Sequence, residues 1–215
     1  MLDELAGMLA GIKDSSLSRD ELDMRGHELD LIDVLTLNTI ADWVRFGCSS
    51  FSVSAKLAAD GKPFTARNLD YLLDANKKII GGPIIVANGT DDPVRADWLS
   101  ATWPGLIGLY SGMTKDGVSM YIHDALLSAG GRKVGFVPRA IVAREVIERI
   151  DPRDPVTSAE KLFRERPSYI GSNFHLSAPN ADGTDIVAAC LEYDGRTRDG
   201  GGVRGDEPPA GGHRR

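Results

Sequence analysis

A cysteine, an arginine and an aspartate occupy positions from which they could act together. Cys48 lies in the stretch Gly47-Cys48-Ser49-Ser50-Phe51-Ser52-Val53, where polar and apolar side chains alternate as they do in a β-strand. A turn signal follows at 59–62, and residues 64–69 are predicted to form the returning strand. We therefore predict a hairpin that brings Arg67 and Asp70 back beside the Cys48 sulfur.

A thiolate is the reactive form of cysteine, so a nucleophilic Cys48 needs a neighbouring cation or base. One source is a histidine and an amide side chain from elsewhere in the chain, as in thiol proteases. The other is the α-amino group that a cut just before Cys48 would free, whose unperturbed pKa is about 7.7–8.0. Gly47 favours such a cut because it has no Cβ and tolerates strained conformations. Against both stands the reading that Cys48 is a small packed residue.

Helical patterns flank this hairpin in the sequence. The apolar-rich segment 1–13 is a candidate helix, and Ser18-Arg19-Asp20-Glu21 fits a capping box that would start a helix running to about Trp43. Pro138 suits the first turn of a helix that ends at Asp151-Pro152. A second capping box, Thr157-Ser158-Ala159-Glu160, is expected to start a shorter helix.

The remaining patterns predict strands joined by tight turns. We expect a buried strand at 84–87 and further strands at 106–110, 118–122, 173–178 and 186–193, with turns at 115–117 and 180–183. Strands paired by hairpins and covered by helices predict a layered α+β domain with antiparallel sheets. Residues 196–215 are rich in glycine, arginine and proline, so this tail is predicted to be disordered.

Composition excludes several classes of protein. The chain has 215 residues, enough for one domain, and a net charge of −6, which argues against nucleic-acid binding. It contains no apolar run long enough to cross a membrane. Two cysteines make no disulfide framework, and the four histidines lack ligand spacing, so neither a metal nor a cofactor is expected. The acidic start Met1-Leu2-Asp3-Glu4 is unlike a signal peptide and predicts a cytoplasmic protein.

The stretch from Cys48 to Asp70 resembles the N-terminal-nucleophile (Ntn) hydrolases of the isopenicillin N acyltransferase type. In that family the mature subunit begins with Cys, and a later strand reads close to Gly-Arg-Asn-Met-Asp-Trp. Here the strand is Ala66-Arg67-Asn68-Leu69-Asp70-Tyr71. Weaker resemblances lie at 104–118, at Asn173 and in the strand that ends at Glu192. The resemblance spans about residues 18–195 and implies an αββα layered sandwich.

The resemblance also implies site roles. Cys48 would be the nucleophile for both self-cleavage at Gly47–Cys48 and substrate attack, and Arg67 would hold its thiolate. Asp70 would orient the new α-amine, and Asn173 would help hold the oxyanion. The family usually supplies a further oxyanion asparagine where this chain has His123-Asp124. A carboxylate there would repel an oxyanion unless it were protonated or turned away, whereas His123 could donate in its place.

The implied enzyme is an autoprocessing amidohydrolase or acyltransferase, synthesised as a zymogen. It would act on a small N-acyl amide through an acyl-thioester. Its parts would be a pro-segment or α subunit (1–47), a catalytic domain (48–195) and the tail (196–215), with an α/β heterodimer after the cut and homo-oligomers as a further state.

One departure concerns the end of the chain, since the family's second sheet continues where this tail begins after Gly195. A truncated product, a frame shift and a shorter member completed by a partner chain all stay open. Two alternative functions follow. One is an inactive binding or assembly subunit, and the other is a Cys48–His123–Asn173 thiol hydrolase that is not cut.

Overall fold

The structure, a computed structural model, describes residues 1–18, 22–23, 26–43, 47–70, 82–125, 134–166, 169–194 and 202–205. Its helices are α1 (Leu2–Lys13), α2 (Leu31–Asn38), α3 (Ile40–Trp43), α4 (Arg139–Arg149) and α5 (Pro155–Arg164). Its strands are β1 (Gly47–Val53), β2 (Phe64–Asp70), β3 (Ile84–Asn88), β4 (Trp98–Thr102), β5 (Ser111–Thr114), β6 (Ser119–Asp124), β7 (Ser172–Pro179), β8 (Ile186–Asp194) and β9 (Gly202–Gly205).

These strands form two antiparallel sheets. Strands β3 to β9 follow one another in chain order across a seven-stranded sheet, and β1 pairs with β2 in a separate hairpin. The mixed α+β class with antiparallel sheets is therefore confirmed. Within the described ranges, no helix is long and apolar enough to span a lipid bilayer.

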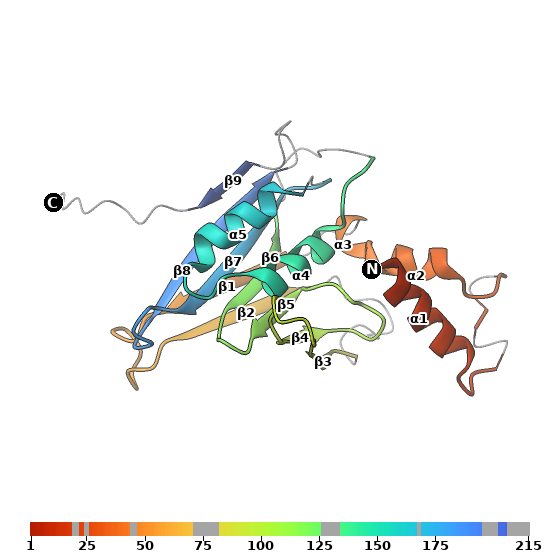
Figure 1. Cartoon of the computed structure of the whole chain (residues 1–215), viewed down its shortest axis with the longest axis horizontal. Helices are drawn as coiled ribbons and strands as arrows, with labels where there is room; N and C mark the ends of the chain where they lie inside the picture. The colour runs from red at the N-terminus through yellow and green to blue at the C-terminus, as the bar shows by residue number, and fades with distance from the viewer. Residues whose placement is uncertain are drawn as a thin grey trace.

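The larger sheet separates the helices from the hairpin. Helix α4 packs against β5 and β6, and α5 packs against β7 and β8 (Figure 1). The hairpin lies on the opposite face, where β1 contacts β6. The sheet thus has one face for a hydrocarbon core and one face for the hairpin that carries Cys48.

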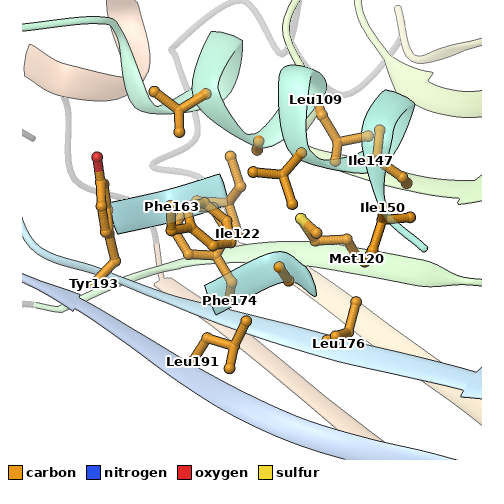
Figure 2. Close-up of a cluster of buried hydrophobic side chains, with 14 of the residues drawn as sticks. Leu109, Met120, Ile122, Ile147, Ile150, Phe163, Phe174, Leu176, Leu191 and Tyr193 are labelled. Atoms are coloured by element: carbon orange, nitrogen blue, oxygen red, sulfur yellow. The ribbon is translucent and has the colours of Figure 1, made fainter. Parts of the chain in front are cut away.

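The core lies between the helices and the sheet (Figure 2). Phe163 of α5, Phe174 of β7 and Tyr193 of β8 are fully buried, and the Phe163 and Phe174 ring centroids lie 4.3 Å apart. The alternation of β7 explains the division of the two faces. Phe174 and Leu176 are buried in this core, whereas His175 and Ser177 bond to residues of the hairpin.

The helix starts differ from two predictions. Residues 22–23 and 26–30 are not helical: Asp23 and Glu28 form a β-bridge, Gly26 has φ +94°, and the Asp30 side chain caps α2 at its N-terminus. Residues 19–21 of the first predicted capping box lie outside the described residues. The second box is wrong because α5 already begins at Pro155, whose fixed φ suits the first helical position. The helices at 2–13 and 139–149 agree with prediction.

The strand predictions need two corrections. Strand β3 is an edge strand rather than a buried one, since the Ile85 side chain is 70% exposed. Residues 106–110 are not a strand, because they pack against the N-terminal turn of α4. The Leu109 amide donates a hydrogen bond to the Ala140 carbonyl oxygen there. A Cβ at Gly108 would lie only 2.6 Å from the Ala140 Cβ. The strand that pairs with β3 and β5 is β4, which the sequence patterns did not predict.

The tail also departs from its prediction at one point. Disorder was expected throughout 196–215, yet Gly202–Gly205 forms strand β9 and pairs antiparallel with β8. The rest of the predicted tail lies outside the described residues, as does Tyr71.

Candidate active site

Cys48 stands near the start of β1 with its side chain on the inner face of the hairpin. The side chain is half-buried and packs at the border of the hydrophobic core, while the neighbours Gly47 and Ser49 are exposed. The predicted alternation of β1 is therefore present. Cys48 is neither sealed among aliphatic side chains nor fully in solvent.

The guanidinium of Arg67 points at the Cys48 sulfur. Arg67 Nη2 lies 3.3 Å from Cys48 Sγ, and Arg67 is the one hydrogen-bond partner of this sulfur within the described residues. Strand pairing explains the contact, since Arg67 lies opposite Ser50 and thus diagonally across from Cys48. Arg67 therefore places a fixed positive charge within hydrogen-bond distance of this sulfur.

Arg67 also fastens the hairpin to the larger sheet. Its Nη1 donates to the Tyr110 carbonyl oxygen at 2.7 Å and to the Ser111 hydroxyl, and its Nη2 donates to the Ile122 carbonyl oxygen at 2.5 Å. These acceptors lie just before β5, at its first residue, and within β6. The guanidinium is therefore aimed at the sulfur by groups from two other strands.

Asp70 lies beside the peptide bond that precedes Cys48. It stands directly opposite Gly47 in the β1–β2 ladder, and its carboxylate accepts a hydrogen bond from the Asn68 amide at 2.6 Å. Both Gly47 and Asp70 are exposed. The structure thus brings together Arg67, Asp70 and Cys48, as the sequence pattern predicts.

His123 and Asn173 lie on the sheet that faces Cys48. They are directly opposite each other in the β6–β7 ladder, and both line the same pocket as Cys48, with a volume of about 550 Å³. The imidazole of His123 bonds to the Ser50 hydroxyl at 2.8 Å and to the Cys48 main chain. Asp124 forms a buried ion pair with Arg139, so its charge is compensated.

A chain of hydroxyl and imidazole groups fills the space between the two sheets. Ser50 Oγ lies 2.5 Å from His175 Nδ1, and Ser52 Oγ lies 2.8 Å from His175 Nε2. From Ser52 the chain continues to Thr65 and Ser177, with 2.8 Å at each step. The sequence patterns did not predict this hydroxyl–imidazole chain. The alternating serines of β1 were the signal for it.

Both imidazoles in this chain are held toward the neutral form. Burial lowers the pKa of His123, and the Arg67 charge lowers it further, while the bond to the Cys48 main chain raises it. Burial also lowers the pKa of His175. A neutral imidazole both donates and accepts, which is what a ring between two hydroxyl groups needs.

Two other polar clusters have structural explanations. His27, Asp30 and Asp33 bring their ligand atoms within 4.8 Å of one another, but Asp30 and Asp33 form the capping box of α2, and Asp33 bonds to His27. A second cavity of about 630 Å³ is lined by charged side chains. Among them, Arg144 bonds to Glu4 and Glu148, which ties α1 to α4.

No protein-family profile matches the sequence, and no curated protein matches it. Among solved structures, the chain is similar to an ortholog, from Caenorhabditis elegans, of N-acylethanolamine-hydrolyzing acid amidase. The TM-score is 0.46 and the sequence identity is 16%. The match covers 74% of this chain and 63% of that one, so the chain spans less than two thirds of that structure. The function is therefore inferred from the geometry around Cys48.

Proposed function

We propose that this chain is an Ntn amidohydrolase or acyltransferase that cuts itself between Gly47 and Cys48 and then uses Cys48 as its nucleophile. The observation that carries the proposal is the 3.3 Å contact between Arg67 and the sulfur, with Asp70 opposite the residue before the cut. Three layers have counterparts in an αββα sandwich, since α4 and α5 cover the seven-stranded sheet and the β1–β2 hairpin lies on its other face.

Self-cleavage would proceed by attack of the Cys48 sulfur on the Gly47 carbonyl carbon. A C–S bond forms, the C–N bond to Cys48 breaks, and the released amine takes a proton. Water then hydrolyses the thioester, which leaves a Gly47 carboxylate and a free thiol. Gly47 and Ser49 are exposed, so water has access to this bond.

Substrate turnover would use the new α-amine as the base. The amine takes the thiol proton, the sulfur attacks the substrate amide, and the amine passes the proton to the leaving nitrogen. Asp70 would orient the amine, because it lies opposite the residue that is removed. Asn173, whose amide has no hydrogen-bond partner within the described residues, and His123 line the pocket where the oxyanion would form. Water or an acceptor amine would release the acyl group.

The uncut Cys48–His123–Asn173 hydrolase has less support. The His123 ring bonds to Ser50 and to the Cys48 main chain, while the sulfur bonds to Arg67. A base must reach the proton that it removes.

Intact mass spectrometry of the purified full chain tests the proposal. We expect fragments 1–47 and 48–215 from the wild type, no fragments from Cys48→Ala, and normal cleavage in the matched control Cys190→Ala. An intact wild-type chain whose Cys48 also resists iodoacetamide would refute the proposal.

A further inference from the structure

The pocket beside Cys48 is lined by hydrogen-bonding and small side chains. Strand β1 contributes Cys48 and three serines, β6 and β7 contribute two imidazoles and the Asn173 amide, and β8 contributes Ala188, Ala189 and Cys190. Among the described residues, no leucine, isoleucine, valine, methionine or aromatic hydrocarbon ring lines this pocket. The bulky apolar side chains of β7 and β8, such as Phe174 and Leu191, are buried in the core on the other face.

The charged side chains near the pocket already bond to other residues. The Asp124 carboxylate forms an ion pair with Arg139, and these two side chains are 3% and 1% exposed. The Arg67 guanidinium is directed at the sulfur and at two main-chain carbonyl oxygens. The two histidines are held toward the neutral form by burial. The Asp124 carboxylate, whose charge Arg139 balances, therefore does not attract a cationic ligand into the pocket.

The lining determines what a ligand gains by entering. Each methylene buried in an apolar pocket raises affinity about fourfold, which corresponds to ~0.8 kcal/mol. Here a methylene would lie partly against hydroxyl, imidazole and amide groups and partly against the alanines of β8, so that gain is smaller than in an apolar pocket. A ligand hydroxyl or amide, in contrast, finds the Asn173 amide without a partner among the described residues.

We propose that the pocket favours an acyl group that carries its own hydrogen-bonding group over a plain hydrocarbon acyl chain of the same length. This inference rests on the proposed function, because it places the acyl carbonyl at the Cys48 sulfur.

Chloromethyl ketones, R–CO–CH2Cl, test the inference without requiring amide turnover. The Cys48 sulfur forms a C–S bond to the methylene carbon, chloride leaves, and buffer takes the thiol proton. One series has linear alkyl R groups of increasing length, and a matched series bears a hydroxyl group at the same lengths. The second-order rate constant for labelling Cys48 in the full chain is measured by mass spectrometry and divided by the rate constant with glutathione.

We expect the normalised rate constant to rise by much less than fourfold with each added methylene, and to be higher for the hydroxyl series. A rise of about fourfold per methylene would overturn the inference. Ala188→Leu adds hydrocarbon to the lining and should make the alkyl series rise with length. Val187→Leu is the control, since Val187 neighbours Ala188 on β8 but is not part of the lining.

The outcomes separate this inference from the proposed function. A chain that labels with the expected preference but neither cuts itself nor hydrolyses amides would refute the function and support the pocket's preference. A chain that cuts itself but labels about fourfold faster with every added methylene would refute the preference alone. A Cys48 that reacts with iodoacetamide but with none of the ketones would overturn the inference.

Discussion

Gly47 and Asp70 face each other across the β1–β2 ladder at contact distance. A Cβ placed on Gly47 would lie 3.3 Å from the Asp70 Cβ and 3.7 Å from Asp70 Oδ2. The residue before the proposed cut therefore has no side chain at a position where even a methyl group would press on the carboxylate that is proposed to orient the amine.

Gly47→Ala is accordingly expected to slow self-cleavage by at least about tenfold, because small displacements of reacting groups have large kinetic effects. The measurement is the rate at which fragment 48–215 appears after synthesis, followed by mass spectrometry. Gly89→Ala is a suitable control, since a Cβ there has only Asp97 Oδ1 nearby, at 3.8 Å. Equal rates for Gly47→Ala and the wild type would contradict this role of the glycine.

Arg67→Lys is expected to reduce the rate of Cys48 alkylation at pH 7 by about tenfold and to lower the free energy of unfolding by about 2 kcal/mol. A lysine keeps the charge, but its single ammonium group cannot bond to the sulfur, Tyr110 O and Ile122 O in the geometry of the fork. Iodoacetamide kinetics and urea unfolding measure the two effects.

The control for Arg67→Lys is Arg153→Lys, because the Arg153 side chain is 91% exposed. Its effect on unfolding should stay within about 0.5 kcal/mol. If Arg67→Lys alkylated as fast as the control, the guanidinium would have no role in activating the sulfur.

Ser50→Ala is expected to destabilise the protein by about 1–3 kcal/mol, because two imidazole nitrogens, His123 Nε2 and His175 Nδ1, lose their partner. Ser49→Ala is the matched control one residue away. The Ser49 side chain is exposed and makes no hydrogen bond within the described residues, so its loss should change stability by less than about 0.5 kcal/mol. Urea unfolding at pH 7.5 compares the pair, and equal midpoints would show that the hydroxyl–imidazole chain contributes no stability.

Asp42→Asn is expected to change how stability depends on pH. Burial raises the pKa of Asp42 to about 6, against the lowering influence of Arg139. A carboxyl with a raised folded-state pKa favours the fold at low pH, and this contribution is lost as pH rises from about 4 to about 6. The unfolding free energy of Asp42→Asn minus that of the wild type should therefore rise by about 3 kcal/mol between pH 4 and pH 7.

Asp182→Asn provides a control of opposite sign for Asp42→Asn. Hydrogen bonds from Thr184 lower the pKa of Asp182, so its carboxylate stabilises the fold above the unfolded-state pKa. The same difference for Asp182→Asn should fall as pH rises. A flat difference for Asp42→Asn would mean that Asp42 is ionised in the fold at no cost.

The sequence predicts the local parts of this molecule well. The hairpin that pairs Cys48 with Arg67 and Asp70 depends on alternation and a nearby turn, which are local signals. Helix α4 follows from its apolar spacing after Pro138, and the β7–β8 hairpin follows from the turn at 180–183.

The predictions that were wrong concern contacts between segments that are distant in the sequence. The start of α2 is set by Asp30 rather than Ser18, and residues 106–110 leave the sheet because Gly108 packs against Ala140. The hydroxyl–imidazole chain joins Ser50 to His175, which are 125 residues apart, and no local pattern pairs them. Alternation in the sequence indicates that the β1 serines share one face of the strand, but it does not identify their hydrogen-bond partners.

The hydrogen bonds that anchor Arg67 bear on when the Cys48 sulfur could attack the Gly47–Cys48 bond. The acceptors that aim the guanidinium are synthesised 43 and 55 residues after it, at Tyr110 and Ile122. A nascent chain that ends at β2 contains Cys48 and Arg67 in one hairpin. It still lacks the Tyr110 and Ile122 carbonyl oxygens that orient the guanidinium. If the chain cuts itself as proposed, the cut would therefore wait until β5 and β6 are made and folded, and an unfinished chain would be protected from it.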